Sequence, residues 1–214
     1  MPSVLISLSS FGAAEVGRHG QLWCTEIVRQ AGADGSEVRG ELLRDAAAEL
    51  PGLQGRAAVY SSPDGLFARN GSLDVAALTR ALHIAQVLQA ARLKMAIGDF
   101  SGSSHGSLPA LKQQLAQQHV ELLIENDQTR AAGTVDALEA FFKAQDAAGL
   151  DLGMTFDMGN WHWLGVPTAS CKAVCSARAL HPLQGRPTPA RQMGRGAAGR
   201  IRSTLARGVA GLAA

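Results

Sequence analysis

The sequence predicts an α/β fold in which six strands alternate with helices around a parallel sheet, closed or partly closed as a barrel. Short apolar, β-rich runs alternate with segments of helical period, and short loops bearing Gly or Ser join them. Polar residues fall at or just past the ends of successive runs. No glycine-rich phosphate-binding motif follows any run, which weakens the doubly wound, nucleotide-binding alternative.

The N-terminal elements are predicted from apolar periodicity. Residues 4–8 form a short apolar run, and residues 13–31 follow with a helical pattern. In residues 36–43, charged side chains alternate as they do along a strand, and residues 56–60 predict the third strand. Ser72 is the expected N-cap of a long helix that ends near residue 90.

The remaining elements repeat this order. Residues 92–97, 120–124 and 152–156 predict three more strands, and residues 108–118 predict a helix between the first two. Thr134 is the expected N-cap of a helix that reaches residue 148. In a barrel the carboxyl ends of the strands converge on one mouth, where barrel enzymes place their chemistry. The polar residues at these ends are Ser9, Ser10, Glu41, Ser61, Lys94, Glu125, Asn126 and Asp157.

Charge divides the chain at Asp157. All 18 acidic residues lie at or before Asp157, and the rest of the chain carries eight Lys or Arg. No basic-then-apolar leader and no apolar run of roughly 18 residues is present, so we expect a soluble, cytoplasmic protein that does not enter a membrane. The three cysteines predict no disulfide framework, and we interpret Cys171 and Cys175 as incidental thiols.

Glu125 and Asp157 each follow an apolar strand directly. Two carboxylates on successive strands repel each other unless something positive lies between them, since burying an unpaired charge is costly. A divalent metal is one solution. The alternative is that one carboxylate pairs with Lys94 or Arg92 while the other caps a loop.

Six segments of residues 3–165 together resemble the xylose-isomerase-like barrels, a superfamily of sugar phosphate isomerases and epimerases that also includes endonuclease IV-type nucleases. They are SLSSFGAAEVGRHGQ, GADGSEVRGELL, VYSSPDGLF, RLKMAIGDF, LLIENDQT and FDMGNWHW. The resemblance implies that Glu125 and Asp157 bind a divalent metal and that Glu125 also shuttles a proton. It further implies substrate contacts at one mouth, from Asn160, Lys94, Tyr60, Glu41 and His162. Packing is an equal alternative for Tyr60 and His162.

The implied activity is a sugar or sugar-phosphate isomerase or epimerase that abstracts a proton next to a carbonyl. Glu125 would be the base, and the metal would stabilise the enediolate. An oxygen-rich site favours Mn²⁺ or Mg²⁺, and Co²⁺ or Zn²⁺ if an imidazole joins. The expected partner is a small sugar or sugar phosphate, and a homo-oligomer is compatible with the sequence. The alternative is a catalytically dead barrel fragment, or a binding protein without turnover.

The chain departs from the family pattern after residue 166. The family's His and Glu ligands on two further strands have no counterpart, so we expect an incomplete (β/α)8 barrel over residues 1–166 and an irregular basic tail over 167–214. The segment LHPLQG can be encoded so that a second frame reads Tyr-Ile-His-Cys-Lys-Gly, and we hypothesise a frameshift between about residues 164 and 180. No aromatic residue follows Trp163, so a nucleic-acid-binding tail is not expected, and the strand ends carry too few His for a nuclease of the endonuclease IV type.

Overall fold

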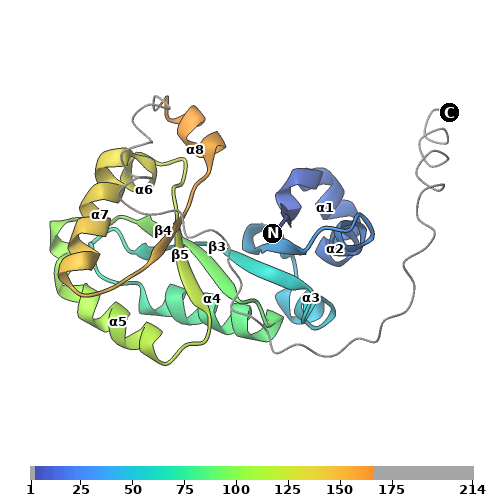
Figure 1. The fold of residues 1–214 in the computed structure, drawn as a ribbon, viewed down its shortest axis with the longest axis horizontal. Coiled ribbons are helices and arrows are strands. Elements are labelled where there is room, and N and C mark those ends of the chain that lie inside the picture. The colour runs from blue at the N-terminus through green and yellow to red at the C-terminus, as the bar shows by residue number, and fades with distance from the viewer. Residues whose placement is uncertain (1–2, 166–214) are drawn as a thin grey trace. The chain divides into compact units, whose positions relative to one another are not determined.

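A computed structural model describes residues 3–165, which form a six-stranded, fully parallel sheet (Figure 1). The strands pair in the order in which they occur along the chain. Their bounds are β1 Leu5–Ser7, β2 Gly35–Arg39, β3 Ala57–Phe67, β4 Arg92–Gly98, β5 Glu121–Glu125 and β6 Gly153–Thr155. The predicted tail, residues 167–214, lies outside the described residues.

Helices connect successive strands. The α-helices are α1 Ala13–His19, α2 Gln21–Gln30, α3 Ala46–Leu53, α4 Val75–Leu88, α5 Leu108–Ala116, α6 Arg130–Gly133, α7 Val135–Ala147 and α8 Met158–Trp163. Three 3-10 helices, η1 Leu8–Phe11, η2 Gly40–Leu42 and η3 Gly102–Ser107, each follow the carboxyl end of a strand.

The sequential strand order confirms the predicted barrel type. In a doubly wound sheet the strand order reverses at a switch point, and it does not reverse here. Six strands in barrel order make an incomplete (β/α)8 barrel. Within residues 3–165, β1 pairs only with β2, and β6 pairs only with β5.

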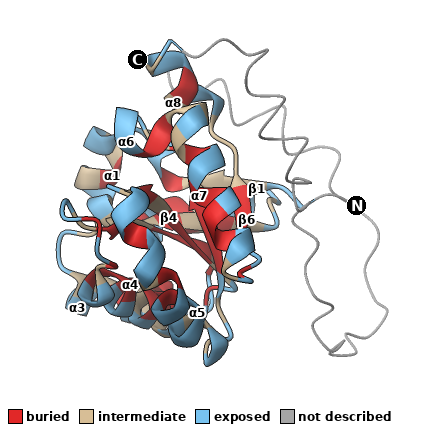
Figure 2. Cartoon of the chain, turned by 90° about the vertical axis from the view of Figure 1, so that its left-hand side faces the viewer, coloured by how far each residue is buried: buried red, intermediate tan, exposed pale blue. Residues whose placement is uncertain are grey.

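The two faces of the sheet differ in chemistry. Strand register places Val38, Tyr60 and Leu93 side by side, and these side chains belong to the hydrophobic core. Figure 2 shows buried residues along the strands and on the helices that cover them. The neighbouring register row contains Arg39, Ser61 and Lys94, so it lies on the opposite face of the sheet. That face would line the interior of a barrel, and it carries charges at its carboxyl edge.

Most predicted boundaries hold within a few residues, but the predicted helix at 13–31 was wrong as one helix. It divides at Gly20, which ends α1 and precedes α2 with φ of +81°. This backbone conformation is open to glycine and strained for other residues, and it interrupts the helical hydrogen bonds.

Tertiary context also changed two predicted details. Asp74, not Ser72, is the N-cap of α4, and its carboxylate accepts a hydrogen bond from Ala77 N at 2.8 Å. The strand predicted to reach residue 43 ends at Arg39, because the chain turns into η2. Thr134 is confirmed as the N-cap of α7.

Sequence reasoning missed α3, whose interior holds Pro51. Its cap was the available signal, because Asp45 accepts a hydrogen bond from Ala48 N at 3.1 Å. Within residues 3–165, none of the helices combines the length and apolar character that crossing a bilayer requires.

Candidate functional site

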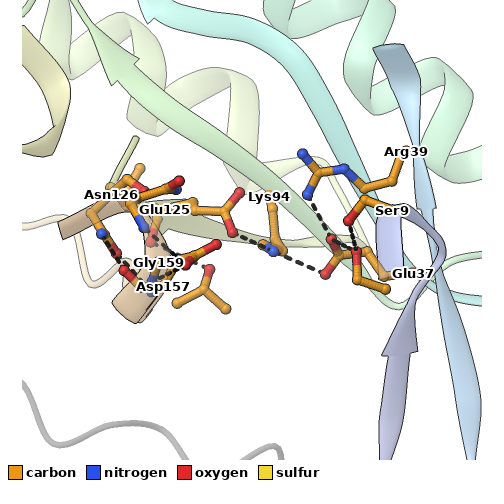
Figure 3. A network of polar contacts seen from close by, with 12 residues as sticks. Ser9, Glu37, Arg39, Lys94, Glu125, Asn126, Asp157 and Gly159 are labelled. Atoms are coloured by element: carbon orange, nitrogen blue, oxygen red, sulfur yellow. Dashed lines mark hydrogen bonds and ion pairs between the residues drawn. The ribbon is translucent and has the colours of Figure 1, made fainter. Parts of the chain in front are cut away.

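A buried lysine links the charged residues on the inner face of the sheet. Lys94, from the middle of β4, places its ammonium 2.9 Å from Glu37 Oε2 and 2.5 Å from Glu125 Oε1 (Figure 3). Glu37 comes from β2 and Glu125 is the last residue of β5. The Lys94 side chain is 8% exposed, so both pairs are largely shielded from water.

Glu37 is fixed by further donors. Its Oε1 accepts hydrogen bonds from Ser7 Oγ at 3.0 Å and from the Arg39 guanidinium at 2.9 Å. Arg39 in turn donates from Nε to Glu41 Oε1 at 2.8 Å. Charges therefore alternate from Glu41 through Arg39, Glu37 and Lys94 to Glu125, and we call these five residues the charge chain.

The same lysine leaves its two carboxylates with opposite pKa shifts. Burial raises the pKa of Glu125 above its ordinary value, and the attraction of Lys94 offsets this only in part. Burial also acts to raise the pKa of Glu37, but Lys94 and Arg39 together hold it below its ordinary value. Glu125 is therefore the more basic of the two carboxylates and the better proton acceptor.

Asp157 organises the loop after β6. Its Oδ1 accepts hydrogen bonds from Gly159 N at 2.7 Å and from Asn160 N at 3.2 Å, which makes it the N-cap of α8. The Asn160 amide donates to Asn126 O at 2.7 Å. Asn126 is fully buried and exchanges two hydrogen bonds with the Asp157 main chain.

The arrangement of Glu125 and Asp157 matches the second of the two sequence alternatives. Glu125 pairs with Lys94, and Asp157 caps a helix. In Figure 3 both residues lie on the same side of the network, at the ends of neighbouring strands.

The other predicted contact residues lie in different surroundings. Glu41 and Asn160 follow β2 and β6 at the carboxyl edge, and His162 is exposed on α8; substrate contact by these three residues stays a prediction. Tyr60 is a correction: strand register places it on the helix-facing side of the sheet, where it is 2% exposed. Burial, with Asp64 and Glu41 nearby, raises the pKa of Tyr60 to about 12. Tyr60 thus packs in the core rather than facing the inner surface with Lys94.

Two residues of the network were not among the predicted contacts. Glu37 and Arg39 alternate with apolar Val38 in β2, and this period of two was the signal that both point to the inner face. Asn126 was predicted at a strand end, but its partner was not, because that partner is the main chain of Asp157, which lies 31 positions away.

The described donors do not fit the divalent metal that the family resemblance implied. Lys94 already holds the position between Glu37 and Glu125, and an ammonium has no lone pair to offer a metal. Asp157 uses one carboxylate oxygen to cap α8. Among residues 3–165, no three His, Cys, Asp or Glu side chains are grouped so that they could hold a metal ion.

Residues 3–165 form part of a parallel (β/α) barrel with a charged network on its inner face, and solved structures of xylose-isomerase-like domains share this fold. Solved structures with this fold include a xylose isomerase domain protein of Salmonella typhimurium, with a TM-score of 0.56 and 12% identity. The match covers 75% of this chain and 62% of that chain.

Two further similar structures have different enzyme names. A probable 3-DHS dehydratase of Bacillus anthracis has a TM-score of 0.55 and 14% identity, over 81% of this chain and 70% of that one. Endonuclease IV of Thermus thermophilus has a TM-score of 0.53 and 16% identity, over 84% of this chain and 72% of that one. No protein-family model and no curated protein matches the sequence. The shared property is the fold, on which several chemistries occur.

Proposed function

We propose that this protein binds a small sugar at the carboxyl edge of the sheet and abstracts a proton next to its carbonyl, as a sugar isomerase or epimerase. The observation that carries this proposal is the buried Glu125–Lys94 pair. It places a base and a cation in one site, and enolisation uses a base near the carbon that loses its proton and a cation near the carbonyl oxygen.

The proposed steps use these two side chains. Burial makes Glu125 a stronger base than an exposed carboxylate, so it accepts the proton from the carbon next to the carbonyl. The negative charge that develops on the carbonyl oxygen is stabilised by the Lys94 ammonium. Glu125 gives an isomer when it returns the proton to the former carbonyl carbon while the enediol hydroxyl proton passes from one oxygen to the other. Delivery of a proton from water to the opposite face of the original carbon gives an epimer, and Glu125 then releases its proton to water.

Asn160 and Glu41 are the proposed contacts for sugar hydroxyls, because both follow strand ends at this edge. Asp157 acts indirectly, since its cap fixes the start of α8 and therefore the position of Asn160. His162, exposed on the same short helix, is a further proposed contact.

The net charge of the charge chain favours a neutral sugar over a sugar phosphate or a nucleic acid. Three carboxylates and two cations give a net charge of −1 when all five groups are ionised. Both cations are already paired with carboxylates, so neither is free to bind a phosphate, and the net negative charge of the charge chain repels an anion.

Binding without turnover is the second candidate, and a specific observation favours it. Lys94 is held by two carboxylates at once, and Asp157 is engaged in a helix cap, so the network is internally satisfied without a substrate. A substrate carbonyl must displace Glu125 from the ammonium before the proton transfer can occur.

Exchange of substrate hydrogen with D₂O separates the two candidates. The purified chain is incubated with aldoses and ketoses, and loss of the α-proton signal is followed by ¹H NMR. We expect exchange that Glu125→Gln abolishes and that Glu121→Gln leaves unchanged, because Glu121 is at the other end of β5 with a half-exposed side chain. Sugar binding without exchange would establish the second candidate instead.

A further inference from the structure

The Lys94 ammonium occupies the centre of a cluster in which both neighbours are carboxylates. The side chains of Glu37 and Glu125 are 12% and 14% exposed, so neither charge is well solvated. Burying two carboxylates close together is unfavourable unless a cation lies between them. Lys94 supplies that cation from within the sheet, at 2.9 Å and 2.5 Å from the two carboxylate oxygens.

The position of this ammonium is set by the residues that hold its partner Glu37. Ser7 and Arg39 hold the Oε1 atom of Glu37 and leave Oε2 for Lys94. The Arg39 main chain is itself fixed, because the buried Gln21 side chain donates to Arg39 O and accepts from Arg39 N, each at 2.8 Å. Three elements, β1, β2 and α2, therefore contribute to the placement of one lysine.

We infer that Lys94 is the resident cation of this site and excludes a divalent metal from the Glu37–Glu125 pair, with Glu37 and Arg39 as its positioning residues. The inference deepens the proposed function by naming the group that bears the positive charge. It does not require turnover, because it concerns only which cation the carboxylates hold.

Removal of the Lys94 charge should create a metal-binding site rather than destroy one. When Lys94 is replaced by Met, the apolar stem stays and the charge is removed. Glu125 then has lost its ion-pair partner, and Glu37 keeps only Arg39, so two largely buried carboxylates share one cation. Carboxylate oxygens are ligands that Mn²⁺ accepts readily. The variant should therefore gain a site for Mn²⁺ that the natural chain does not have.

The experiment is a Mn²⁺ titration of the full-length chain, read by the EPR signal of free Mn²⁺. Binding at this site is the part that Glu125→Gln removes. We expect the natural chain to show no Mn²⁺ binding that depends on Glu125, since an ammonium at contact distance strongly repels a second cation. In Lys94→Met we expect Glu125-dependent binding, with a Kd for Mn²⁺ at least about tenfold lower than the weakest Kd that the titration would detect in the natural chain. Adding Glu37→Gln to Lys94→Met should remove the gain.

Arg92→Met is the matched control, because it also removes one cation from β4 and from an ion pair, with Glu121 at 3.1 Å. It should gain no Mn²⁺ site. Binding in the natural chain that Glu125→Gln abolishes would overturn the inference, and this measurement suffices if Lys94→Met does not fold. Sugar exchange is a separate readout, so absence of exchange together with a Mn²⁺ gain in Lys94→Met would reject the proposed function and support the inference.

Discussion

Asn126 and Asp157 are joined by a reciprocal pair of hydrogen bonds, each 2.8 Å long, between the Asn126 side chain and the Asp157 main chain. The two residues follow β5 and β6, so this pair continues the pairing of the strands beyond the sheet. Because Asn160 donates to Asn126 O, the same contact also holds the start of α8.

Asn126→Ala should lower the free energy of unfolding by about 2–4 kcal/mol, since it removes both hydrogen bonds between the Asn126 side chain and the Asp157 main chain. Urea denaturation followed by circular dichroism measures this change. Asn70→Ala is the control, because Asn70 is exposed and bonds only within its own turn. Equal losses in the two variants would contradict the structural role of Asn126.

Trp161 and Trp163 provide a matched pair on α8. Trp161 is 2% exposed, donates from Nε1 to Gly133 O and packs edge-on against Phe156, whereas Trp163 is 77% exposed. We expect Trp161→Ala to cost about 3–5 kcal/mol and Trp163→Ala to stay within about 0.5 kcal/mol of the natural chain. Thermal unfolding of both variants measures these losses. A larger loss of stability in Trp163→Ala than in Trp161→Ala would contradict the orientation of α8 in the structure.

Gly98 ends β4 in a conformation that excludes a side chain. Its φ is +67°, and a Cβ built there would lie 2.4 Å from Phe67 O, which is main chain and cannot move aside. Gly98→Ala should therefore lower stability by more than about 2 kcal/mol. At Gly102, a Cβ would have no neighbour within 4 Å, so Gly102→Ala should change the urea midpoint little. Tolerance of both substitutions would refute this close approach of β3 and β4.

Glu37 should make stability sensitive to acid. Its pKa in the folded state is below the ordinary value of 4.5, so its contribution is present above about pH 4.5 and is lost as the pH falls through the folded pKa. Glu37→Gln should be less stable than the natural chain at pH 7, by up to about 3 kcal/mol, because Lys94 loses a partner. The difference should shrink below about pH 4.5.

Urea unfolding between about pH 3 and pH 7 measures this dependence. Glu139→Gln, on the exposed side of α7, is the control and should leave the curve unchanged. A difference between Glu37→Gln and the natural chain that stays constant over this range would show that Glu37 is not ionised in an ion pair.

Local patterns were enough to predict most elements, whereas the barrel was favoured over a doubly wound sheet from the polar strand ends and the lack of a glycine-rich phosphate-binding motif. The apolar runs at 92–97 and 120–124 became β4 and β5, and the Thr134 cap was correct, because periodicity and capping depend on residues within one or two turns. Prediction failed where a helix breaker stood inside a helical pattern. Gly20 ends α1 within a continuous apolar period, and Pro51 lies inside α3, which was therefore not predicted as a helix.

The sequence by itself determined which strand residues share a face, because the period of two places alternate side chains on the same side of the sheet. It did not determine where the strands end, since Ser61 and Lys94, predicted at strand ends, lie inside β3 and β4. Only the tertiary structure decided what those residues hold. Glu37 and Lys94 are 57 positions apart, and their ion pair exists because strand register places β2, β4 and β5 at matching heights. Register also decides that Tyr60 lies in the core. Ser61 pairs with Lys94 on the inner face, and Tyr60, the residue before it, therefore faces the opposite side of the sheet.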